Sequence, residues 1–239
     1  MRKLYGLIMG DAKTIARNST LLFVTFLPLL LALIIRFFIP WLADFLQPSI
    51  DLECYYVHIM AIMAIYPPAA FGWVTGFTLL DERDENILTV ISVTPLSRTG
   101  YIVYRLAMPM FIGCVLSYIT LFIVGLIPLH AIKLLPIAMI SSLGAPIAAL
   151  FMVAFTGNKV EGLAMSKGIS LMYIGPLAVI FIESNWQYLA GVIPAFWVSR
   201  AFVSSYSDMF EYWVALGGGL VISTLFILVF LRRFNTRML

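Results

Sequence analysis

Long apolar segments alternate with short polar ones along the 239-residue chain. The apolar runs are near 20 residues long, which is about what an α-helix needs to cross a hydrocarbon core of about 30 Å. Because the runs are continuous rather than alternating, they do not fit the strands of a membrane barrel. The pattern predicts one membrane domain spanning residues 1–239, with six transmembrane helices at about 20–41, 56–80, 101–127, 131–156, 168–184 and 210–231.

Composition supports the membrane class. The chain is 62% hydrophobic and 11% charged, whereas a soluble domain carries about 25% charged residues. So few polar side chains cannot cover the surface of a water-soluble fold. We therefore expect an all-α polytopic membrane protein.

The basic residues indicate the orientation of the spans. Twelve of the 15 lie in the N-terminal stretch, the 81–105 and 157–167 loops and the C-terminal tail. Cytoplasmic segments of membrane proteins are enriched in Lys and Arg. The pattern predicts a multi-pass protein of the bacterial inner (cytoplasmic) membrane with both termini in the cytoplasm.

Residues 186–206 are apolar enough to suggest a seventh span. A seventh crossing would place the basic C-terminal tail outside, and Pro194 and Arg200 argue against a straight helix. We predict instead a re-entrant helical hairpin that enters from the outer face before the sixth span. At the other end of the chain, residues 1–18 have apolar residues at helical spacing with basic ones between them, and predict an interfacial helix.

A dense charged block, DERDEN at residues 81–86, follows the second span. Apolar residues at helical spacing come next, and Pro95 ends the run. This pattern predicts a short amphipathic helix on the cytoplasmic surface, with its acidic residues at the start, where the helix dipole favours them. The alternative is an ordinary solvated loop, but such a loop has no need for an apolar face formed by Ile87, Leu88, Val90 and Ile91. We favour a docking site for a cytoplasmic partner.

The same run resembles the coupling segment of the ABC-2 family of ABC transporter permeases, E-x-E-x-G-T-L-x-x-L-x-x-T-P-L-S. Residues 94–97, TPLS, match its ending residue by residue, while Asn86 and Ile87 stand where the family usually has Gly and Thr. The layout of the whole chain is also similar. Segments 157–168 (GNKVEGLAMSKG) and 191–202 (GVIPAFWVSRAF) further resemble permeases of the fluoroquinolone-export group.

The resemblance implies partners for the chain. Two copies of a separate ATPase subunit would bind ATP and Mg, and a second copy of the permease or a homologous permease would complete the pathway. The chain itself has no Walker A pattern, so we expect a transport subunit with no cofactor of its own and no catalytic residue. The resemblance implies an ATPase-coupling interface in the 81–97 segment, formed by Glu82, Arg83, Glu85, Asn86, Leu88, Ile91, Thr94 and Pro95.

The implied function is outward export of a drug-like or amphipathic substrate. The spans contain no Asp, Glu, Lys or Arg well inside the bilayer, which favours ATP-driven over gradient-driven transport. Alternatives are export of a lipid, peptide or polysaccharide, or a membrane scaffold that transports nothing. Besides these proteins we expect membrane lipid as a partner and no nucleic acid. The histidines, His58 and His130, lie on different loops and predict no metal site.

Three smaller patterns lie within the spans. Gly72 and Gly76 form a G-x-x-x-G pair for helix packing, against another span of the same chain or against a second subunit. Pro67 and Pro68 should kink the second span, with the freed carbonyls covered by neighbours. A group of aromatic residues could line a translocation route, although lipid-facing or core packing is the alternative: Phe71, Trp73, Phe77, Phe111 and Tyr173.

Overall fold

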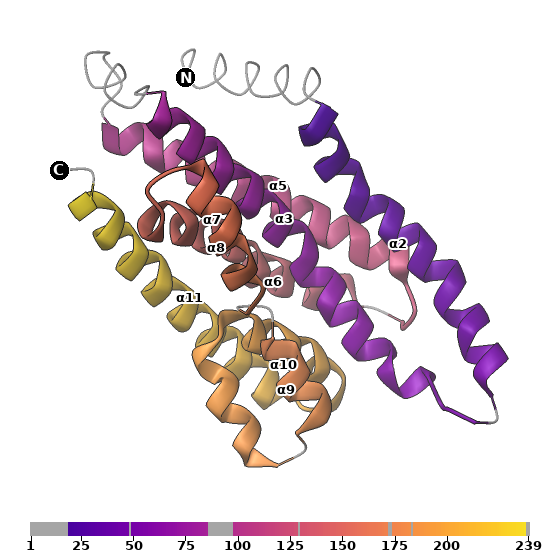
Figure 1. The fold of residues 1–239 in the computed structure, drawn as a ribbon. Coiled ribbons are helices and arrows are strands. Elements are labelled where there is room, and N and C mark those ends of the chain that lie inside the picture. The colour runs from indigo at the N-terminus through magenta and orange to yellow at the C-terminus, as the bar shows by residue number, and fades with distance from the viewer. Residues whose placement is uncertain are drawn as a thin grey trace.

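A computed structural model of the chain describes six stretches, residues 19–47, 49–85, 98–128, 130–171, 174–182 and 184–237. Within them the ordered elements are all helical, as Figure 1 shows. The interfacial helix predicted for residues 1–18 and most of the predicted coupling segment, residues 86–97, lie outside the described residues.

Five helices in the described stretches are long and apolar enough to cross a membrane. They correspond to five of the six predicted spans, and the short helix η1 (Glu53–Tyr55) precedes the second. In the described part of the chain, the structure therefore agrees with an all-α membrane protein that crosses the bilayer several times. The five spans are α2 (Ser19–Leu46), α3 (Tyr56–Asp84), α5 (Arg98–Val124), the stacked pair α6 (Ala131–Ser142) and α7 (Gly144–Phe155), and α11 (Met209–Arg237).

The region of the remaining predicted span, residues 168–184, is divided between two short helices. Helix α8 (Lys159–Leu171) ends inside it, and the next described helix is α9 (Gly175–Phe181). Pro176 falls in the first turn of α9, where its missing N–H is tolerated, whereas the interior of a longer helix would lose a hydrogen bond there. The count of six spans therefore stays a prediction.

The segment predicted to be re-entrant, residues 186–206, consists of η2 (Asn185–Val192) and α10 (Pro194–Ser207), which meet at Ile193. Neither is long enough to be a span. Figure 1 places α9 and α10 together at one end of the bundle, beside the first half of α11. Their depth in a membrane stays a prediction.

Helix α10 packs on α11 around the indole of Trp197. A Cβ atom at Gly218 would lie 2.6 Å from the Trp197 ring, and one at Gly219 would lie 3.1 Å from the Trp197 Cβ, so only glycine admits this approach. The indole N–H donates to the Gly191 carbonyl at 2.6 Å, which ties η2 to the first turn of α10. The contact fixes where α10 begins relative to α11.

The proline pair in α3 frees backbone carbonyls in the middle of the bundle. Pro68 has no N–H, so the carbonyl of Ala64 loses its usual helical partner. The hydroxyls of Ser117 on α5 and Ser141 on α6 both donate to that carbonyl, the second at 2.7 Å. The prediction that neighbours cover the freed carbonyls is confirmed at Ala64.

This arrangement predicts a non-additive pair of substitutions. Ser117→Ala or Ser141→Ala alone leaves the Ala64 carbonyl one donor, and we expect each to lower the free energy of unfolding by less than about 1 kcal/mol. The double variant leaves the carbonyl unpaired and should lose about 3 kcal/mol. Thermal unfolding of the four proteins in detergent measures the difference. Strictly additive losses would contradict the shared role of the two hydroxyls.

Two glycines bring α3 against α7 of the same chain. A Cβ at Gly72 would lie 2.8 Å from the Cα of Ala145 and closer still to its carbonyl oxygen. A Cβ at Gly76 would lie 3.3 Å from the Cα of Ala149. The G-x-x-x-G pair therefore lies in an intramolecular helix contact.

The buried apolar side chains form two clusters along the bundle. We call them the outer cluster, which includes Met60, Leu121, Phe202 and Tyr212, and the inner cluster, which includes Leu80, Leu150, Met152 and Phe234. The inner cluster lies beside the end of α3 that leads to residues 86–97. The charged residues at that end are described next.

Candidate functional site

The acidic block forms the last turn of α3. The helix continues to Asp84, and the N–H of Glu85 donates to the Asp81 carbonyl at 2.9 Å. The expectation that residues 81–84 begin a new helix is therefore wrong. No Gly or Pro interrupts this run, so the backbone hydrogen bonds continue after the hydrophobic pattern stops at Leu80. Carboxylates at a helix C-terminus meet the negative end of the dipole and need nearby cations.

Cations from two other helices supply this compensation. The buried Glu82 forms an ion pair with Arg105 of α5. Asp81 pairs with the Nζ atom of Lys159 on α8 at 2.9 Å, and the Lys159 backbone N–H donates to an Asp84 carboxylate oxygen at 3.2 Å. These contacts join the end of α3 to α5 and to the start of α8.

Arg83 caps the end of α7. Its guanidinium donates to the carbonyls of Val153 at 3.3 Å and Thr156 at 2.7 Å, and also to Gly157. These carbonyls belong to the last turn of α7 and the residues after it, where an α-helix leaves acceptors without an internal partner. A planar fork of N–H groups can reach all of them at once, and its charge also suits a helix C-terminus.

A second arginine reaches the same helix end from α11. The Nε atom of Arg233 donates to the Ala154 carbonyl at 3.4 Å, and its guanidinium lies 4.3 Å from the centroid of the Phe155 ring. Helices α5, α7 and α8 therefore meet α3 at this end of the bundle, and α11 joins them through α7. We call the set the charged cluster: Asp81, Glu82, Arg83, Asp84, Arg105, Lys159 and Arg233.

Three basic residues lie outside the segments predicted to be cytoplasmic, and all three are found at the other end of the bundle. Arg36 donates to the Ile123 carbonyl at 2.7 Å, and Lys133 donates to the Ser205 carbonyl at 2.7 Å. Arg200 forms an ion pair with Glu211 of α11. For the basic residues with contacts given above, the helix packing thus reproduces the division between two ends that was inferred from the sequence.

The structure gives the predicted coupling residues different surroundings. Glu82 and Arg83 are engaged within the chain, whereas Glu85 is exposed. Their contact with an ATPase stays a prediction, as does that of the members outside the described residues: Asn86, Leu88, Ile91, Thr94 and Pro95.

The sequence did not identify three partners in the charged cluster, namely Arg105, Lys159 and Arg233. The signal available was coarse: all three lie in segments placed on the cytoplasmic side by their Lys and Arg content. That grouping places them at one end of the bundle, but it cannot say which acid or carbonyl each one meets.

The aromatic residues proposed for a translocation route have mixed environments. Phe71 is buried, whereas Phe111 on α5 is about two-thirds exposed (67%). Trp73 and Phe77 pack edge to face on α3, with ring centroids 5.2 Å apart. Tyr173 lies outside the described residues. The route stays a prediction.

Comparison with known proteins identifies the group. Residues 11–231 match the model of the family described as "Fluoroquinolones export permease protein Rv2686c-like". The chain belongs to this family. The fluoroquinolone-export permeases MT2760 and Rv2686c of two Mycobacterium tuberculosis strains, CDC 1551 / Oshkosh and ATCC 25618 / H37Rv, are each 31% identical to it over 190 residues. The match covers 78% of this chain and 75% of each relative.

No solved structure matches the chain. The resemblance of the sequence to the fluoroquinolone-export group is nevertheless confirmed. This member of the Rv2686c-like family is a multi-pass membrane protein of the export permease type.

Proposed function

We propose that this Rv2686c-like permease is the membrane-spanning subunit of an ATP-driven ABC exporter. The proposal is supported by the TPLS ending at residues 94–97 and by the position of that run directly after the second long helix. ATP and Mg are bound by two copies of a separate ATPase subunit. A second permease copy completes the pathway in the bacterial inner membrane.

The substrate class and the orientation follow from separate arguments. The names of the relatives favour a fluoroquinolone or a similar drug-like amphipathic molecule, carried outward. The charged cluster faces the cytoplasm, because it contains basic residues from the segments richest in Lys and Arg. The apolar side chains exposed along α2 and α11 then contact lipid or the second permease.

The charged cluster is the observation that carries the mechanism. ATP must favour one arrangement of the permease pair over the other, so movement of the ATPases has to reach several helices. The segment at residues 86–97 begins directly after the last turn of α3, and that turn is bound to α5, α7 and α8. A displacement of this segment is therefore passed to the group of helices rather than to α3 alone.

Glu85 provides the test of docking, because it is exposed and has no role in the charged cluster. Glu85→Lys should reduce ATP-dependent export roughly tenfold. The new positive charge would lie in the contact with the ATPase either without an acidic partner or beside another positive charge. The measurement is nucleotide-dependent uptake of a fluoroquinolone into inside-out vesicles that contain the permease and its ATPase.

Glu53→Lys is the matched control, because Glu53 is an exposed acid near the opposite end of α3. It should export at the normal rate. Export by Glu85→Lys at the level of this control would contradict docking at residue 85. Purification of the native complex without any Walker-containing protein, together with ATP-independent export, would contradict the ABC mechanism itself.

A further inference from the structure

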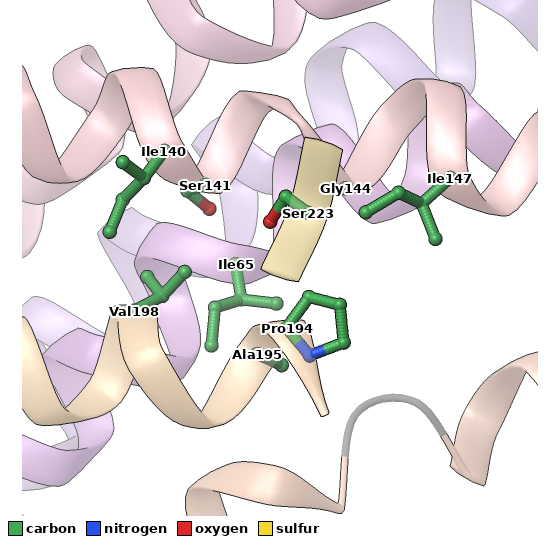
Figure 2. A pocket seen from close by; sticks show the side chains of 9 residues that line it. All are labelled: Ile65, Ile140, Ser141, Gly144, Ile147, Pro194, Ala195, Val198 and Ser223. Atoms are coloured by element: carbon green, nitrogen blue, oxygen red, sulfur yellow. The ribbon is translucent and has the colours of Figure 1, made fainter. Parts of the chain in front are cut away.

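A small cavity lies where the outer and inner clusters meet. Its volume is about 30 Å³, and it is partly open and lined by residues of α3, α6, the start of α7, α10 and α11. Figure 2 shows that its wall is apolar except for the hydroxyls of Ser141 and Ser223. A space of this size holds one water molecule or one small polar group.

The two hydroxyls offer complementary hydrogen bonds. Ser223 is 3% exposed and makes no hydrogen bond to another described residue, so its O–H is free to donate. The Ser141 proton is used at the Ala64 carbonyl, which leaves the Ser141 oxygen to accept. In Figure 2 the Ser223 oxygen points toward the side of the cavity where Ser141 lies. The cavity therefore presents one donor and one acceptor.

The start of α10 makes one side of the cavity electropositive. Pro194 and Ala195, the first two residues of this 14-residue helix, line the cavity. Pro194 has no N–H and the Phe196 N–H already donates to the Ile193 carbonyl at 3.1 Å, so this end contributes the positive end of the helix dipole. The packing of Trp197 against α11 fixes the end of the helix at this point. An oxygen acceptor placed in the cavity is favoured by this arrangement.

The wall also limits the charge of the ligand. None of the nine lining residues is ionisable. A charged group in an apolar site without a counter-ion is strongly disfavoured. The group that fits is neutral, accepts from Ser223 and donates to Ser141, as a hydroxyl or an un-ionised carboxylic acid does.

We propose that this cavity binds a hydroxyl or un-ionised carboxyl group of the exported amphipathic substrate, with Ser223 as donor and Ser141 as acceptor. The inference rests on the proposed function for the identity of the substrate. Because of its size, the cavity holds only this polar group, and the larger part of the substrate lies outside it.

Two matched pairs of variants test the proposal. Ser223→Ala removes the free donor, and Thr224→Val removes the hydroxyl of the exposed threonine next to it. Gly144→Val places methyl groups in the cavity, and Gly217→Val places them on the exposed face of α11. A Cβ atom at either glycine meets no atom within 4 Å, so neither change causes a direct clash at that atom.

The probe is a fluoroquinolone, which carries a carboxylic acid, titrated against the full chain in lipid nanodiscs. Ser223→Ala should weaken its binding about tenfold, the loss of one hydrogen bond. Gly144→Val should weaken it at least as much, whereas Thr224→Val and Gly217→Val should bind as the wild type does.

Equal binding by the site variants and their controls would overturn the inference, because the cavity would then hold water alone. Absence of drug binding to the wild-type chain would overturn it too. ATP-dependent export is measured separately in vesicles. If the wild-type chain shows no ATP-dependent export but drug binding still depends on Ser223, the proposed function is contradicted and the site is supported. If export is normal but the site variants bind the drug as well as their controls do, the site alone is contradicted.

Discussion

Replacing Gly72 with alanine is expected to lower the free energy of unfolding by about 3 kcal/mol. The added methyl group would lie 2.8 Å from the Cα of Ala145 and nearer to its carbonyl oxygen. Both are backbone atoms of α7 and cannot rotate away, so the two helices must separate. The inner cluster, which depends on the contact of α3 with α7, would loosen as a result.

Two other glycines provide graded controls for this effect, measured by thermal unfolding in detergent. At Gly76 the nearest atom is the sulfur of Met152, at 2.7 Å, and this flexible side chain can move, so Gly76→Ala should have a smaller effect. At Gly217 no atom lies within 4 Å, and alanine should be neutral or stabilise α11 by up to about 1 kcal/mol. Equal stability of the Gly72 and Gly217 variants would contradict the close approach of α3 and α7.

Arg105→Gln is expected to produce the second large effect, a loss of about 2 kcal/mol with a parallel loss of export. It removes the cation paired with Glu82, whose side chain is 10% exposed and whose second carboxylate oxygen has no hydrogen-bond partner among the described residues. A nearly buried carboxylate without its cation destabilises the end of α3. Because the Arg105 side chain is 22% exposed, solvent screening keeps the loss below that of a fully buried pair.

A second substitution should rescue this variant. With Glu82→Gln added, two neutral amides replace the ion pair, and most of the stability lost in Arg105→Gln should return. Lys159→Gln is the control, because its pair with Asp81 is about half exposed and should contribute less than about 1 kcal/mol. Unfolding of the wild type, Arg105→Gln, Glu82→Gln and the double variant gives the coupling energy, and additive effects at residues 82 and 105 would contradict the ion pair.

Most of the bundle could be predicted from the sequence, because a helix that crosses a membrane needs about 20 consecutive apolar residues. Runs of apolar residues near 20 long identify five spans, with ends that differ from the helices by a few residues. The region of residues 168–184 shows the limit of this approach. Hydropathy reports how apolar the run is, but not that one helix ends at Leu171 and another begins at Gly175, where the Phe196 backbone comes close.

The end of α3 shows a second limit. The hydrophobic pattern stops at Leu80 and predicts that the span stops with it, but backbone hydrogen bonds do not depend on the polarity of side chains. The acids at residues 81–84 remain helical because cations from distant parts of the sequence compensate them. Such pairings depend on how the helices pack, and only the grouping of basic residues could be read from the chain.

The hydroxyl groups in the core were missed for the same reason. Ser117 and Ser141 are ordinary residues of apolar spans in the sequence, and their role follows from the position of Pro68 on another helix. Ser223 likewise gains importance only from the cavity beside it. The sequence predicted that freed carbonyls need donors, but not which side chains supply them.

Charges at this end of the bundle fall into two groups with different sensitivity to ionic strength. The Debye length is about 10 Å at 0.1 M salt, so exposed charges such as Glu85 are screened. The Glu82–Arg105 pair and the guanidinium of Arg83 on the α7 carbonyls are partly buried and are screened much less. If a partner docks through Glu85 as proposed, salt should therefore release it while the helices of the permease stay joined.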